Sequence, residues 1–194
     1  MKTDVIIVTG SDETTEAALA QADKIAAYKD LSPKSALHLR LLVEEVMGMM
    51  RSITGETRGE FWIEEKDTEF QIHLRVDTAM SFEKREKLLS ASTTGKNEAA
   101  KGLMGRLRNL FEQGEPETGA FLYHPRMLET TGALDWEWSM VAYQSELSQR
   151  IEKDESSRQM WDELEKSVVT HVADDVKVSI KGRCAEMIIF KKMT

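Results

Sequence analysis

The most basic stretch of this acidic chain could hold phosphate groups. It places four cations, Lys96, Lys101, Arg106 and Arg108, around the glycines Gly102 and Gly105. Lysine and arginine pair with phosphate oxygens through charge-assisted hydrogen bonds, and a local excess of positive charge attracts anions. The same residues could instead form a solvated helix face. The stretch therefore has two interpretations, a phosphate site and an ordinary surface.

Two carboxylates occupy positions where they could also do chemistry. Glu45 follows Glu44 within an apolar helical pattern, and Asp77 ends an alternating strand. A pair of glutamates on a helix is commonly solvated, and an aspartate at a strand end commonly caps the following turn. Glu45 and Asp77 are therefore candidates whose role depends on their neighbours.

Several common catalytic and metal-binding signatures are missing from the sequence. There is no His-Glu-x-x-His, and Gly95-Lys96 lacks the upstream glycine and the following Ser or Thr of a phosphate-binding P-loop. The four histidines show no metal-ligand spacing: His38, His73, His124 and His171. A single cysteine excludes cysteine-cluster zinc sites and intrachain disulfides. We therefore expect no metal site, and structural roles for the histidines.

Local signals predict the elements of the first half of the chain. Residues 5–9 form a β-branched run, and a helix is expected over 14–30. Ser32-Pro33 is a typical helix start, with the serine as N-cap and the proline as first helical residue. Apolar residues then recur at helical spacing over 33–53, which places Glu45 on a long helix.

A hairpin is expected next, followed by a helical segment. Residues 61–65 and 70–76 flank Lys66-Asp67-Thr68, and alternation in the second run puts His73 and Asp77 on its polar face. The pattern then predicts helices over 82–89 and 99–111. Residues 117–137 carry glycines and a proline and indicate an irregular connection.

The last part of the chain is predicted to contain two helices, over 138–153 and 157–169, and a hairpin of 176–180 with 187–190. The order of elements predicts an α+β fold, a two-layer sandwich of a mixed β-sheet with helices on one face. We expect one domain over 1–194, with a helical insertion over 114–167. The insertion gathers aromatic residues that could pack a core or bind a partner: Trp136, Trp138, Tyr143 and Trp161.

Composition narrows the classes of partner. The 194 residues include 26 Lys and Arg against 34 Asp and Glu, which gives a net charge of −8. This charge argues against a general nucleic-acid or anionic-membrane surface. No run of about 18 apolar residues is present to span a bilayer. With a lone cysteine and no targeting segment, we expect a cytoplasmic protein.

The helix Leu-Arg-Leu-Leu-Val-Glu-Glu-Val-Met-Gly-Met-Met-Arg-Ser-Ile over 39–53 resembles the N-box helix of the GHKL ATPase superfamily. This superfamily includes histidine-kinase ATP-binding domains, anti-sigma-factor serine kinases and DNA gyrase B. The resemblance gives Glu45 the position of the family's helix glutamate. The metal-binding asparagine of the family, four residues later, is Met49 here. Because magnesium prefers oxygen ligands, a thioether does not replace this asparagine, and magnesium binding is not predicted.

Three further segments resemble family motifs in the family's order. Residues 74–82 are similar to the strand that leads into the Asp-x-Gly-x-Gly box, whose aspartate reads the adenine amino group; Asp77 is retained, with Ala79 and Ser81 in place of the glycines. Residues 101–107 resemble the second glycine box, in which backbone amides meet the phosphates. The terminal hairpin resembles the closing strands, with Ala185 where a threonine usually contacts adenine. The resemblance covers about 13–113 and 168–191.

The resemblance implies ATP as the possible ligand, with Asp77, Lys96, Lys101, Gly102 and Gly105 binding it and Glu45 in the catalytic position. Because several family residues are replaced, our first hypothesis is a regulatory domain, of the histidine-kinase or anti-sigma type, with a degenerate ATP site. Such a domain would act through a protein partner or as a homodimer. The alternative is an active ATP-dependent protein kinase of serine or histidine type. A third possibility is a pocket for another ligand on the same fold.

Overall fold

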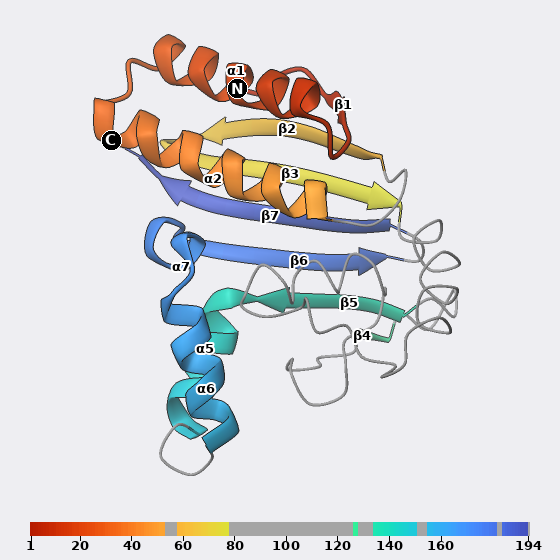
Figure 1. The fold of residues 1–194 in the computed structure, drawn as a ribbon, viewed down its shortest axis with the longest axis vertical. Helices are drawn as coiled ribbons and strands as arrows, with labels where there is room; N and C mark the ends of the chain where they lie inside the picture. The colour runs from red at the N-terminus through yellow and green to blue at the C-terminus, as the bar shows by residue number, and fades with distance from the viewer. Residues whose placement is uncertain (53–57, 78–125, 128–133, 151–154, 182–183, 194) are drawn as a thin grey trace.

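The structure is a computed structural model that describes residues 1–194 apart from 53–57, 78–125, 128–133, 151–154, 182–183 and 194 (Figure 1). Its described strands form one seven-stranded sheet in the order β1-β2-β3-β7-β6-β5-β4, and every neighbouring pair is antiparallel. The strands are β1 (Ile6–Val8), β2 (Gly59–Lys66), β3 (Glu69–Asp77), β4 (Arg126–Met127), β5 (Leu134–Ser139), β6 (Asp175–Lys181) and β7 (Cys184–Lys192). The fold is thus α+β, as predicted, but the described sheet is antiparallel and not mixed.

The hairpin of β2 and β3 forms because the geometry of its turn and the alternation of apolar and polar residues favour the same strand pairing. Lys66 pairs with Glu69, so the turn has two residues, Asp67 and Thr68, with φ of 50° and 70°. Positive φ at both positions is typical of type I′ turns, whose twist matches that of the flanking strands. Alternation then buries Phe70 and the other apolar side chains of β3 on one face. The predicted hairpin is confirmed, with strands longer than expected.

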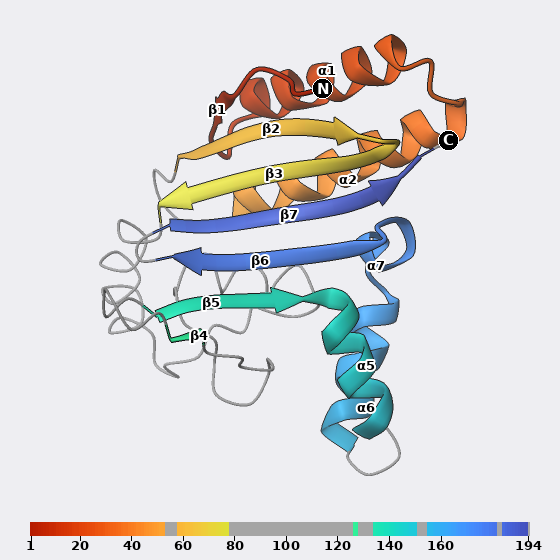
Figure 2. The ribbon, with the colours of Figure 1, turned by 180° about the vertical axis from the view of Figure 1, so that it is seen from behind.

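Two helices, α1 (Asp12–Tyr28) and α2 (Pro33–Ser52), lie over one face of the sheet, as Figure 1 and its reverse view, Figure 2, show together. The Ser11 side chain accepts a hydrogen bond from the Thr14 backbone N–H and caps α1. Ser32 does the same for Ser35, and Pro33 begins α2, as predicted. The apolar stripes of both helices and the inner side chains of the strands make one continuous core.

The C-terminal half differs most from the prediction. Residues 134–139, expected within an irregular connection and a helix, form β5, which pairs with β6. The helix predicted from Trp138 begins at Met140 as α5 (Met140–Arg150). The helix predicted over 157–169 is two helices, α6 (Glu155–Glu165) and α7 (Val168–Val172). The predicted insertion is therefore not only helical, because its described residues include two strands of the sheet, β4 and β5.

The position of α5 is fixed by a carboxylate of the neighbouring strand. Asp175, the first residue of β6, accepts hydrogen bonds from the Val141 backbone N–H and the Ser139 hydroxyl, both at 3.2 Å. Ser139 in turn accepts from the Ala142 N–H. These contacts satisfy backbone donors of the first turn of α5 and favour a negative charge at the positive end of the helix. The helical predictions over 82–89 and 99–111 lie outside the described residues.

Candidate functional site

Glu45 lies on α2 beside the stripe that the helix buries against the sheet. Its neighbours Leu42 and Val46 are fully buried, whereas Glu44 is exposed and Glu45 is partly buried. Burial disfavours the charged form, and the adjacent Glu44 carboxylate repels a second negative charge. Both effects raise the pKa of Glu45, with burial the larger cause. A carboxyl group with a raised pKa can accept and return a proton near neutral pH more readily than an exposed one.

Met49 follows Glu45 by one helical turn and belongs to the core. The two positions are four residues apart on a helix and therefore neighbours on its surface. Met49 is 3% exposed and is part of the continuous apolar core. A buried thioether packs well among apolar side chains and is a poor ligand for magnesium. The position that the family resemblance assigns to a metal ligand is thus occupied by a core residue.

Asp77 is the last residue of β3 and is exposed, opposite Cys184 of β7. The preceding pair, Val76 and Ala185, is buried on the face that carries the helices. Ala185, which stands where the family has a threonine, is fully buried. Because side chains alternate along a strand, Asp77 belongs by register to the opposite face from Val76.

The C-terminal end of α2 and the end of β3 lie at the same end of the sheet (Figure 1). Gly59, the first residue of β2, pairs with Val76, and a Cβ at Gly59 would lie 3.4 Å from Met50 Cε. The helix α2 thus packs on the sheet at this end, but Asp77 belongs by register to the other face, so Glu45 and Asp77 lie on different sides of the sheet. Lys96, Lys101, Gly102 and Gly105 lie outside the described residues, as do Ala79 and Ser81.

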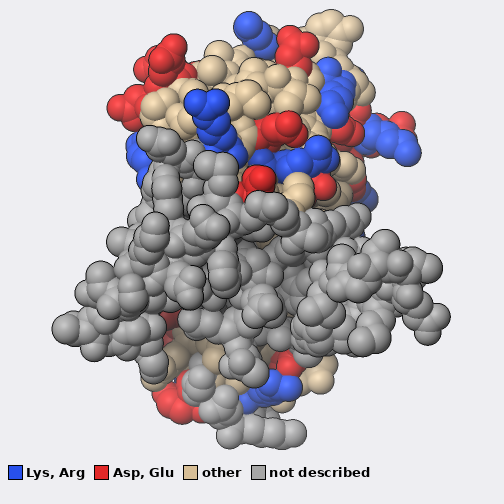
Figure 3. All heavy atoms as spheres, turned by 90° about the vertical axis from the view of Figure 1, so that its right-hand side faces the viewer, with Lys and Arg blue, Asp and Glu red and all other residues tan. Residues whose placement is uncertain are grey.

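Figure 3 views the molecule from this end of the sheet. On the described atoms that it shows, Lys and Arg side chains alternate with Asp and Glu. The described part of this face thus presents no extended area of one sign.

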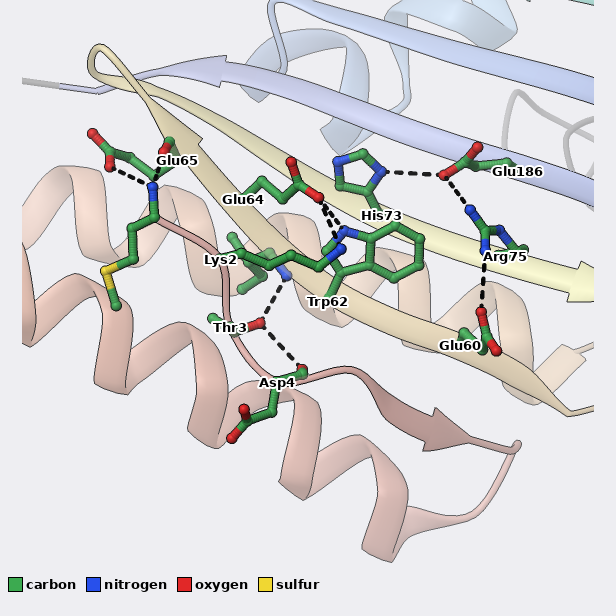
Figure 4. Close-up of polar contacts among 12 residues, drawn as sticks. Lys2, Thr3, Asp4, Glu60, Trp62, Glu64, Glu65, His73, Arg75 and Glu186 are labelled. Atoms are coloured by element: carbon green, nitrogen blue, oxygen red, sulfur yellow. Dashed lines mark hydrogen bonds and ion pairs between the residues drawn. The ribbon is translucent and has the colours of Figure 1, made fainter.

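A second group of polar residues, which the sequence did not single out as a site, lies on the face of the sheet opposite to α1 and α2 (Figure 4). We name it the outer-face cluster; it comprises Lys2, Glu60, Trp62, Glu64, His73, Arg75 and Glu186. Trp62 of β2 and His73 of β3 are cross-strand partners, and their rings stack with centroids 4.6 Å apart and planes 10° from parallel. Although they lie on the outer face, Trp62 is only 4% and His73 only 6% exposed. The cluster thus has a small buried centre, the Trp62–His73 stack, within a more exposed set of charged side chains.

Charged side chains surround this stack. Lys2 Nζ lies 4.5 Å and Arg75 Cζ 5.2 Å from the centroid of Trp62, both within cation–π range. Glu64 Oε1 accepts from Trp62 Nε1 at 2.8 Å and pairs with Lys2 Nζ at 3.1 Å. Each cation is thus tied both to the ring and to a carboxylate, as Arg75 also lies near Glu60 and Glu186.

His73 is the buried titratable group of the cluster. Its Nδ1 lies 3.3 Å from Glu186 Oε1, and its Nε2 is buried without a hydrogen-bond partner among the described residues. Burial is the main cause that lowers the pKa of His73, and Lys2 acts in the same direction. Glu186 and Glu64 oppose this effect. The neutral ring, with its proton on Nδ1 toward Glu186, is therefore the favoured form. The strand alternation signalled that His73 faces away from the core, but Glu186 is 113 residues distant and its pairing is not visible in the sequence.

The described residues contain no group of three or more His, Cys, Asp or Glu side chains placed to hold a metal ion. In the same ranges, none of the helices has the length and apolar character needed to cross a membrane. No model of a known protein family matches the sequence, and no curated protein matches it either.

Proposed function

We propose that this protein is a regulatory domain of GHKL-like type that has lost metal-dependent ATP chemistry and acts mainly by binding a protein partner. The observation that carries the proposal is Met49, a 3% exposed core residue at the position that the family resemblance assigns to the metal ligand. By register Asp77 lies on the face of the sheet away from α2, so the proposal does not depend on Glu45 and Asp77 forming one site.

The chemical argument concerns the phosphates. Phosphoryl transfer from ATP depends on a metal ion that neutralises the charge developing on the phosphate oxygens. A side chain packed into the core at position 49 offers neither an oxygen nor the freedom to turn toward a ligand. The domain would therefore keep the architecture of an ATP site while losing its reaction. In this proposal the protein is cytoplasmic, and a protein partner or a second copy of the chain binds to its surface.

One observation favours the alternative of an active protein kinase. The raised pKa of Glu45 suits a carboxylate that accepts a proton from an attacking group. In that case another oxygen ligand must replace position 49, and Glu44, the other acidic residue of α2, is a candidate.

Calorimetric titration with a non-hydrolysable ATP analogue, with and without magnesium, separates the two functions. The regulatory proposal expects no strengthening of binding by magnesium. Micromolar binding that magnesium strengthens would contradict it and favour the kinase. The purified chain would then be assayed for phosphate transfer to itself and to captured partners.

A restoring substitution sharpens this test. Met49→Asn returns the oxygen ligand of the family, so we expect magnesium-dependent binding of the analogue to appear. Met49→Leu, which keeps an apolar core residue, is the matched control and should not gain it. Burying the amide is expected to lower the free energy of unfolding by about 1–3 kcal/mol, so folding of Met49→Asn is checked first by circular dichroism. A folded Met49→Asn protein that gains no magnesium dependence would count against the assigned site.

A further inference from the structure

The residues that precede β1 connect the outer-face cluster to the helical layer. Lys2 forms an isolated antiparallel bridge with Glu64, and the Thr3 backbone N–H donates to the Ile63 carbonyl at 2.9 Å. The Thr3 hydroxyl accepts from the Ile63 N–H and contacts Gln21 of α1, both at 2.9 Å. We name residues 2–4 the strap, because they attach to β2 on one side and to α1 on the other.

Lys2, Trp62 and His73 belong to three adjacent segments of the sheet and interact in that order. The ammonium group of Lys2 contacts the Trp62 ring, and the Trp62 ring stacks on His73. Beyond His73, the next strand contributes Glu186. The Trp62 ring therefore separates the imidazole from the ammonium group of Lys2, so a charge on the buried imidazole would interact with Lys2, which is itself half exposed.

Protonation of His73 would change two interactions of Lys2 together. It would set a third cation beside the Trp62 ring, in addition to Lys2 and Arg75, and this charge would repel the ammonium group of Lys2. It would also attract the carboxylate of Glu64 toward the charged imidazole. The Oε1 atom of Glu64 is shared between Trp62 Nε1 and Lys2 Nζ. At the same time, the added N–H on Nε2 has no acceptor among the described residues, so the charged ring gains by moving out of the stack.

We propose that His73 and the strap form a proton-sensitive latch, in which the neutral imidazole favours Lys2 docked on Trp62 and the protonated imidazole releases it. In the part of the chain that the structure describes, the charged groups that face His73 are Lys2 from the strap, Glu64 from β2, Arg75 from β3 and Glu186 from β7. Arg75 is held by Glu60 and Glu186, so Lys2 is the cation whose attachment depends on Glu64. Because the strap also holds Gln21, release would loosen the contact between β2 and α1.

Coupling of this kind is reciprocal, which gives a direct test. If protonated His73 weakens the docking of Lys2, removal of the Lys2 charge must make His73 easier to protonate. The pKa of His73 is measured by following its Cε1–H resonance against pH in the wild type and in two lysine variants. Lys2→Met should raise the pKa of His73 by about half a unit, the size expected for one partly exposed charge nearby. Lys24→Met, which removes an equal charge from an exposed position on α1, should leave it unchanged.

The second measurement follows the strap itself. Half a pH unit corresponds to a factor of about three in an equilibrium constant, so hydrogen exchange of the Thr3 amide should quicken about threefold when His73 becomes charged, after correction for the intrinsic rate. In His73→Phe, which keeps an aromatic partner for Trp62, this change should vanish. Equal His73 pKa values in the wild type and Lys2→Met would overturn the latch. The latch would also be overturned if the exchange of the Thr3 amide had the same pH dependence in the wild type and in His73→Phe. A His73 that stays neutral down to the pH at which all the proteins unfold would overturn it as well.

Discussion

At the scale of single residues, burial of His73 has a consequence for stability that is separate from any motion of the strap. Its pKa lies below the ordinary value of 6.5 because the charged ring would be desolvated. The unfolded chain therefore takes up the proton first as the pH falls. The contribution of neutral His73 to stability is complete above about pH 6.5 and is lost as the pH falls from there through the lowered pKa of the folded state.

We accordingly expect His73→Phe to unfold with a weaker pH dependence than the wild type between pH 7.5 and 5. Phenylalanine keeps the stack on Trp62 and has no titratable nitrogen, so the difference between the two proteins isolates His73. The measurement is the urea midpoint at each pH, with His171→Phe as the control for an exposed histidine. An identical pH dependence in the wild type and His73→Phe would show that the folded protein accommodates the charge without cost.

At the scale of elements, the turn of the β2–β3 hairpin has local backbone strain. Thr68 has φ of 70°, a conformation that a β-branched side chain rarely adopts and glycine adopts readily. We expect Thr68→Gly to raise the free energy of unfolding by about 0.5–1 kcal/mol, since Asp-Gly is preferred in such turns. Thr68→Ala, which keeps a Cβ at positive φ, is the matched control. Urea unfolding should rank glycine above alanine, and the reverse order would mean that the threonine side chain contributes a contact that outweighs the strain.

The start of α5 supplies a second element-scale prediction. Asp175→Ala removes the acceptor shared by Ser139 and the Val141 N–H, so the first turn of α5 loses its cap. The expected loss is about 1–2 kcal/mol in the free energy of unfolding, measured by urea denaturation. Asp162→Ala, at an exposed position of α6, should change it by less than about 0.5 kcal/mol. Equal effects of the two substitutions on the free energy of unfolding would show that Asp175 does not cap α5.

Elements with complete local signals were predictable from the sequence. The start of α2 depends on Ser32 and Pro33, and the hairpin depends on alternation around Asp67-Thr68, so neighbouring residues suffice. The alternation of Leu134-Asp135-Trp136-Glu137-Trp138-Ser139 also signals a strand, but the glycines and proline of 117–137 favour an irregular connection, and the helical pattern after it is predicted to begin at Trp138. The pairing of His73 with Glu186 depends on the register between β3 and β7, which no local pattern contains. Of the candidate site, Glu45 could be placed on its helix and Asp77 at its strand end, but their surroundings depend on how the layers pack.

At the scale of the whole molecule, β7 joins the two halves of the chain. It pairs with β3 from the N-terminal half and with β6 from the C-terminal half. Met187 lies opposite Leu74 on one side and Val178 on the other, and all three side chains are fully buried. Because this residue contacts both halves of the core, its removal should weaken them together and not one after the other.

Met187→Ala is therefore expected to lower the free energy of unfolding by about 2–4 kcal/mol while preserving a single transition. Native-state hydrogen exchange of amides in β2 and in β6 is the measurement, and both sets should lose the same protection, because global unfolding exposes them together. The control is Leu37→Ala, which truncates a residue of α2 that is 55% exposed. This substitution should change the protection of both sets of amides only slightly. Loss of protection confined to β6 would mean that the C-terminal strands open as a separate unit. The N-terminal half, with α1, α2 and the β2–β3 hairpin, would then hold its structure while β6 opens.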